Sequence, residues 1–165
     1  MSKKRRNTSL GESDFRNIRE KDLYFVDKTD LIRVVHEGYQ VLLLTRPRRF
    51  GKTLALSMLR YFYGNNIAYR ALFDGLSVSQ DTQLMALQGQ NPVVWLSFKK
   101  VKAETWADAL YLLCDCLVES MAEHGYLGEH PVYAVPYQEA MTALKSRHPD
   151  PVRCATILKR LIEWL

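Results

Sequence analysis

One stretch decides the expected fold, and it reads Val41-Leu42-Leu43-Leu44-Thr45-Arg46-Pro47-Arg48-Arg49-Phe50-Gly51-Lys52-Thr53. Four apolar residues before a turn signal predict a strand over 41–44, because a strand inside a parallel sheet is apolar on both faces. From Leu54 onward, apolar residues recur at helical spacing, at Leu54, Met58, Leu59 and Phe62. We therefore expect residues 45–53 to be a loop that joins a buried strand to a helix.

The loop ends in Gly51-Lys52-Thr53, the second half of the phosphate-binding P-loop, or Walker A motif. Free amides at a helix start face an anion, glycine lets the backbone approach it, and the lysine reaches the outer phosphates. The Thr53 hydroxyl can coordinate Mg²⁺. We expect ATP, or another nucleoside triphosphate, to bind with Mg²⁺ at Arg46, Pro47, Arg48, Arg49, Phe50, Gly51, Lys52, Thr53 and Leu54, with Thr53 on the metal.

The start of this loop departs from the usual motif. In Gly-x-x-x-x-Gly-Lys-Thr the first glycine would stand where this chain has Arg46, and Pro47 follows it. Arginine resists positive φ, and a proline pushes the preceding residue toward extended geometry, so the loop must enter its turn differently. Its clustered arginines and lysine favour a polyanion. A bare Gly-Lys-Thr also occurs by chance, and a basic turn is often merely solvated, so the expected strand and helix supply the context that the motif needs.

Two flanking segments extend the pattern, Tyr24-Phe25-Val26-Asp27-Lys28-Thr29 upstream and Pro92-Val93-Val94-Trp95-Leu96-Ser97-Phe98-Lys99 downstream. Together with residues 45–54 they resemble the AAA-ATPase-like domain family of bacterial proteins, and the resemblance covers about residues 11–165. In that family a P-loop ATPase module is often followed by a nuclease-like domain of the PD-(D/E)XK type. The resemblance implies that an arginine in place of the first glycine, here Arg46, is usual in the family. It also implies that residues 24–29 could lie near the bound base. A helix cap is the alternative for that segment, and we assign no catalytic role to Asp27.

Composition and charge limit the class of protein. At 165 residues, with 47% hydrophobic and 25% charged, the chain has the size of one globular domain. A net charge of +5 favours an anionic partner, and much of the excess lies in Lys3-Lys4-Arg5-Arg6 and the loop. No apolar run approaches the roughly 20 residues that cross a bilayer, so no membrane span is expected.

The cysteines and the start of the chain predict a reduced, cytoplasmic protein. The cysteine count of 3 is odd, and no signal peptide precedes the fold. Cys114-x-Cys116 lies inside a helical pattern and lacks the spacing of common zinc pairs, so buried thiols are expected there rather than a metal site.

The rest of the chain predicts an α/β fold. Residues 1–10 are expected to be a disordered basic tail, and residues 11–165 the N-terminal part of an AAA-like P-loop ATPase domain. Helices are expected over 13–20, 29–37, 54–63, 104–124, 137–147 and 151–165, with a second strand over 93–98 and an exposed connection over 125–136. Strand, helical connection and strand imply a P-loop NTPase-like parallel sheet flanked by helices, incomplete at the C-terminus.

One stretch of sequence has the form of a strand that ends in a magnesium-positioning acid. Asp115 ends the apolar run 110–114, but the apolar repeat continues on both sides at helical spacing, so we place it in a helix. The resemblance puts the acidic strand a few residues past Leu165. We therefore expect nucleotide binding without efficient hydrolysis.

An alternative function and an open assembly state remain. The basic loop and tail could bind a nucleic-acid backbone without using a nucleotide. The sequence leaves an oligomer open.

Overall fold

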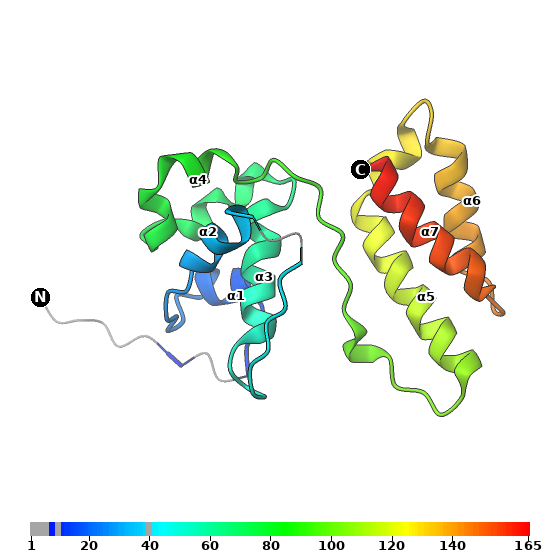
Figure 1. Ribbon diagram of the computed structural model, residues 1–165, viewed down its shortest axis with the longest axis horizontal. Helices are drawn as coiled ribbons and strands as arrows, with labels where there is room; N and C mark the ends of the chain where they lie inside the picture. The colour runs from blue at the N-terminus through cyan, green and yellow to red at the C-terminus, as the bar shows by residue number, and fades with distance from the viewer. Residues whose placement is uncertain (1–6, 9–10, 39–40) are drawn as a thin grey trace, which may run out of the picture. The chain divides into compact units, whose positions relative to one another are not determined.

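The chain folds into two compact helical units. The computed structural model describes residues 7–8, 11–38 and 41–165, and its units run up to Val93 and over Val94–Leu165. Figure 1 shows that each unit is built from helices and connecting loops. Over the described residues no strand forms, and the only ladder feature is an isolated bridge between Gly64 and Asn91.

The first unit contains four α-helices and two 3-10 segments within its described part. They are α1 (Phe15–Glu20), α2 (Asp30–His36), α3 (Lys52–Tyr63), η1 (Ile67–Phe73), η2 (Ser77–Gln80) and α4 (Thr82–Ala86). Short polar side chains begin several of them, because the first amides of a helix lack backbone acceptors. Asp14 accepts from the amide of Asn17 at the start of α1, and Asp81 does the same for the first amides of α4.

Aromatic side chains form the core of this unit. Phe62 on α3 and Phe73 at the end of η1 are both fully buried and meet edge to face, with ring centroids 5.2 Å apart. Phe15 on α1 packs on the Phe73 ring at 5.1 Å. Each buried phenylalanine contributes about 1.5–3 kcal/mol from the area removed from water. The C-terminal half of α3 is thereby anchored, which holds the position of the loop at its N-terminus.

The second unit consists mainly of three α-helices that pack on one another. Its elements are η3 (Phe98–Lys100), α5 (Trp106–Glu123), η4 (Gly125–Glu129), α6 (Ala134–Leu144) and α7 (Pro151–Trp164). Figure 1 shows α5, α6 and α7 side by side, and each of the three contacts the other two. Their shared apolar cluster includes Leu117, Leu144 and Leu161.

The prediction of a parallel sheet is wrong. Residues 41–44 do not form a strand, and Val41 and Leu43 are 84% and 79% exposed. They therefore lack the burial on both faces that such a strand needs. The second expected strand, 93–98, does not form either. All of it except Val93 lies in the other unit, where Val94 and Leu96 pack against the helical cluster. The P-loop NTPase-like sheet is thus replaced by helical packing in the described chain.

Several helix predictions are confirmed. α1, α5 and α7 match the expected ranges within two residues, and α7 begins with Asp150 as cap and Pro151 in its first turn. Cys114 and Cys116 are buried thiols, as expected, and Cys154 is buried as well. No helix of the described residues is long and apolar enough to cross a membrane.

Other local predictions are wrong. The helical spacing predicts that Leu31, Val34 and Val35 form the apolar face of this helix, but α2 buries Ile32 and leaves Val34 exposed. The connection over 125–136 is partly helical, with Leu127 buried, and α6 begins at Ala134 rather than Tyr137. The basic run 3–6 of the expected tail lies outside the described residues.

Candidate phosphate-binding loop

The loop before α3 ends in two left-handed residues. Arg49 has φ 68° and Gly51 has φ 73°, and the helix begins at Lys52. Glycine adopts this conformation freely, whereas in arginine the Cβ makes it unfavourable in free energy. Gly51 holds the position before the first helical residue and has no side chain to accept from the first amides. The start of this 12-residue helix is therefore open to an anion.

The Lys52 side chain turns back over the loop that precedes it. Its Nζ donates to the backbone carbonyls of Arg46 and Pro47, the latter at 2.8 Å. These two bonds close the loop into a ring around the ammonium group. They also hold the ammonium group against the loop that precedes α3.

A second lysine, which the sequence analysis left out of the site, lies at the same loop. The Nζ of Lys28 is 4.0 Å from the position that a Cβ on Gly51 would take. Lys28 is 23 positions earlier in the chain (51 minus 28), so no local spacing could have predicted its approach. The only signal was the family-like segment 24–29, for which the resemblance gave a place near the bound base and the residues themselves gave a helix cap as the alternative.

The residues on either side of Lys28 are fixed by a polar cluster. Asp27 accepts at Oδ1 from the Thr29 amide at 2.9 Å and the Thr29 hydroxyl at 2.7 Å. At Oδ2 it accepts from the Ser77 amide at 2.7 Å and the Ser77 hydroxyl at 2.9 Å. Partial burial raises the pKa of the Asp27 carboxyl, but these hydrogen bonds outweigh burial and hold the pKa below its usual value. Asp27 is thus a structural anion that positions its neighbour Lys28.

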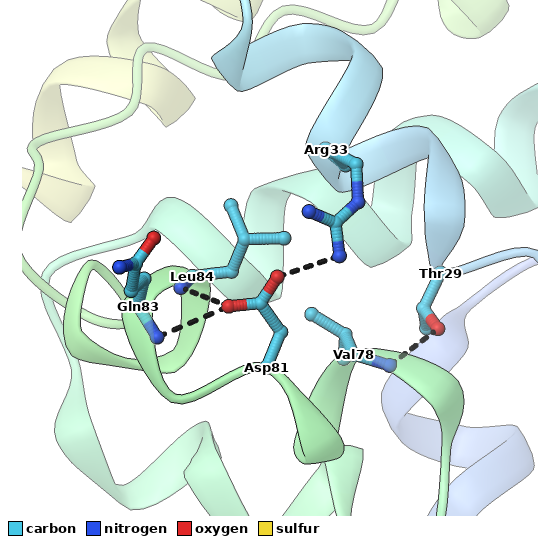
Figure 2. A network of polar contacts seen from close by, with 6 residues as sticks. All are labelled: Thr29, Arg33, Val78, Asp81, Gln83 and Leu84. Carbon is cyan, nitrogen blue, oxygen red and sulfur yellow. Dashed lines mark hydrogen bonds and ion pairs between the residues drawn. The ribbon is translucent and has the colours of Figure 1, made fainter.

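The same cluster continues to η2 and α4. The Thr29 hydroxyl accepts from the Val78 amide at 3.2 Å, and Arg33 donates to Asp81 at 2.6 Å (Figure 2). Figure 2 also shows Asp81 accepting from the amides of Gln83 and Leu84. Backbone hydrogen bonds from α4, helped by Arg33, lower the pKa of Asp81. The start of α2 is therefore tied to η2 and α4 by polar contacts at two points.

The remaining residues expected at the site lie exposed around the loop, except Leu54, which is half-buried and packs against the core of the first unit. Arg46, Arg48, Arg49 and Thr53 are exposed, and Phe50 is 60% exposed. Within the described chain no carboxylate forms an ion pair with these arginines, with Lys28 or with Lys52. Uncompensated cations around an open helix start fit the phosphates of a nucleotide.

A metal would have few protein ligands here. Among the residues that the structure describes, no group of three His, Cys, Asp or Glu side chains is arranged to hold an ion. Magnesium bound with a nucleotide usually takes one or two protein ligands and keeps several waters. The Thr53 hydroxyl at the helix start fits that lesser role.

Comparison with known proteins places this loop inside a family. The chain is 40% identical over 76 residues to an uncharacterized protein in the vnfD 5′ region of Azotobacter chroococcum mcd 1. That alignment covers 45% of this chain and 14% of the relative, so the match spans a small part of the relative's length. No solved structure matches the chain. A family model described as "Predicted AAA-ATPase" matches residues 9–152, which include the whole loop. The chain belongs to this family of predicted AAA-ATPases.

Proposed function

We propose that the loop before α3 binds the phosphates of a nucleoside triphosphate, with ATP as the expected ligand. The supporting observation is the combination of an open helix start after Gly51 with Lys28 and Lys52 beside it, neither of which forms an ion pair with a carboxylate of the described residues. Family membership supports the same proposal. In this site the amides of residues 51–54 and the two lysines face the phosphates, and Arg46, Arg48 and Arg49 add positive charge around them.

A divalent cation bound with the nucleotide would supply charge neutralisation of the phosphates. Thr53 is the residue of this loop that would hold it. Water positioning needs an acidic residue as well, and the Asp27 carboxylate is already engaged by Thr29 and Ser77. We therefore propose binding without efficient hydrolysis by this chain.

One larger statement stays a prediction. It is that residues 11–165 form the N-terminal part of an AAA-like ATPase domain. Reading the coding DNA past Leu165 tests it.

The binding proposal is tested by titrating the full chain with ATP and Mg²⁺. Lys52→Ala should weaken binding by about 10-fold or more, since a hydrogen bond to a charged group contributes about 1.5–3 kcal/mol. Thr53→Ala should weaken binding only when Mg²⁺ is present. Lys21→Ala is the matched control, because Lys21 is an exposed lysine of the same unit at the end of α1. Equal affinity of wild type and Lys52→Ala would refute the proposal.

A second function is favoured by one observation. Phe50 is 60% exposed between the exposed Arg49 and the open helix start, and aromatic and arginine side chains together bind single-stranded nucleic acid. Binding of this kind falls steeply as salt rises and does not distinguish ATP from other polyanions. A salt titration with a single-stranded oligonucleotide, with and without ATP, separates the two functions. Competition by ATP that depends on Mg²⁺ and Thr53 supports the nucleotide site.

A further inference from the structure

Two cysteines from different helices meet in the core of the second unit. Cys114 lies in the middle of α5 and Cys154 in the first turns of α7, and their Sγ atoms are 2.6 Å apart. They are 40 positions apart in sequence, and their residues are 0% and 7% exposed. Packing of α5 against α7 therefore creates this pair, and no short sequence motif does.

The surroundings leave the pair without other polar partners in the described chain. The neighbours in the same buried cluster are apolar side chains, among them Leu110, Leu117, Ile157 and Leu161. Burial, followed by the contact with Cys154, raises the pKa of Cys114 to about 12. In the closed structure the Cys114 thiol is therefore protonated and reacts slowly, because the thiolate is the nucleophile.

The third cysteine faces elsewhere. Cys116 is two positions from Cys114 on the same helix, and its Sγ donates to the backbone carbonyl of Ser97 at 3.3 Å. Zinc sites are usually completed by four ligands, and no group of three candidate ligands occurs in the described residues. Two thiols at this separation, with no third ligand, suit a disulfide rather than a metal.

We propose that Cys114 and Cys154 are a modification site, at which a low-molecular-weight disulfide oxidises them to an intramolecular disulfide that joins α5 to α7. One thiolate attacks the small disulfide, breaks its S–S bond and releases one small thiol. The second protein thiolate then attacks the mixed disulfide, forms the Cys114–Cys154 bond and releases the second small thiol. The two protein thiols lose two electrons and the small disulfide gains them, while the two protons pass to the released thiols. The reverse exchange restores both cysteines.

The bond changes the second unit by closing a loop of 40 positions that includes α6. A cross-link of that length restricts the unfolded chain, so the oxidised unit resists unfolding. Formation requires a brief separation of α5 and α7, because the small disulfide must reach buried sulfurs. Oxidation is therefore slow and its product is stable.

The test uses the full chain in glutathione buffers of increasing oxidised fraction, with no denaturant, followed by alkylation and peptide mapping. Wild type and Cys116→Ser should lose the mass of two hydrogen atoms and yield a Cys114–Cys154 cross-linked peptide, while Cys114→Ser and Cys154→Ala should not. The oxidised form should unfold at a temperature at least about 10 °C higher than the reduced form. If a variant fails to fold, the wild-type peptide map still decides. A cross-link that involves Cys116, glutathione adducts without a cross-link, or a disulfide that forms only in denaturant would overturn the proposal.

Discussion

The Thr29→Val substitution tests whether the polar cluster holds the segment that carries Lys28. Thr29 is 1% exposed, and valine keeps its shape while removing the hydroxyl. Two hydrogen bonds are lost, the donation to Asp27 at 2.7 Å and the acceptance from the Val78 amide at 3.2 Å.

The expected loss of stability in Thr29→Val can be worked out from these two hydrogen bonds. The bond to the carboxylate is worth about 1 kcal/mol once discounted for the solvent at Asp27. Leaving the Val78 amide without an acceptor in a buried place costs about 1–2 kcal/mol. The added methyl group returns up to about 0.8 kcal/mol. The net loss is about 2 kcal/mol, or about 30-fold in the equilibrium constant for opening.

The assay must report on the first unit alone. All 3 tryptophans, at 95, 106 and 164, lie in the second unit, so tryptophan fluorescence is the wrong probe. Hydrogen exchange followed by mass spectrometry reads the two sides of the cluster directly, in peptides over 24–36 and 76–87. Thr29→Val should raise exchange there by about 30-fold and leave peptides of α5 and α7 unchanged. It should also weaken ATP binding, because Lys28 loses its fixed position.

Thr29→Ser is the matched control, since it keeps the hydroxyl and removes only a methyl group. Its exchange should rise by less than about 10-fold, in line with the loss of about 0.8 kcal/mol. If serine and valine have equal effects, packing rather than hydrogen bonding holds the segment. Unchanged exchange in Thr29→Val would refute the reasoning outright.

Three further predictions concern the same unit. Lys28→Met should weaken ATP binding by several-fold without changing the unfolding of the reduced chain. If isothermal titration gives the same affinity for Lys28→Met and wild type, Lys28 is not part of the site. Asp27 has a folded pKa below its ordinary value of 3.8, so its charge stabilises the fold above about pH 4 and that contribution is lost as pH falls through the folded pKa. Asp27→Asn should therefore be less stable at neutral pH and show a flatter acid dependence, measured by circular dichroism between about pH 2 and 7. Gly89 and Gly75 share φ 74°, but a Cβ on Gly89 meets neighbouring backbone at 3.2 Å whereas one on Gly75 meets nothing within 4 Å. Both alanine variants should lose about 1 kcal/mol to backbone strain, and Gly89→Ala should lose about 1–2 kcal/mol more in urea unfolding; equal losses would show that the close approach is relieved without cost.

The local features of this fold could be predicted from sequence, because their causes are local. A polar cap, a first-turn proline and apolar residues at steps of three or four lie within a few positions of one another, and α1 and α7 begin where such signals stand. Gly51 and the first two residues of α3, Lys52 and Thr53, indicated the family for a similar reason, since the motif is contiguous.

The predicted sheet was wrong because a strand depends on a distant partner. Four apolar residues at 41–44 are compatible with a buried strand or an exposed extended segment, and only the packing around them distinguishes the two. The structure leaves Val41 exposed and uses Val94 and Leu96 to cover helices instead.

The sequence by itself therefore determined the starts of α1, α5 and α7 within two residues, the burial of Cys114 and Cys116, and the cationic loop of a predicted AAA-ATPase. Only the tertiary structure decided which distant groups meet: Asp27 with Ser77 across 50 positions, Cys114 with Cys154 across 40, and Lys28 with the loop at Gly51. The physical reason is that such contacts are by-products of helix packing, and helix packing is set by the whole apolar core rather than by the residues that it brings together.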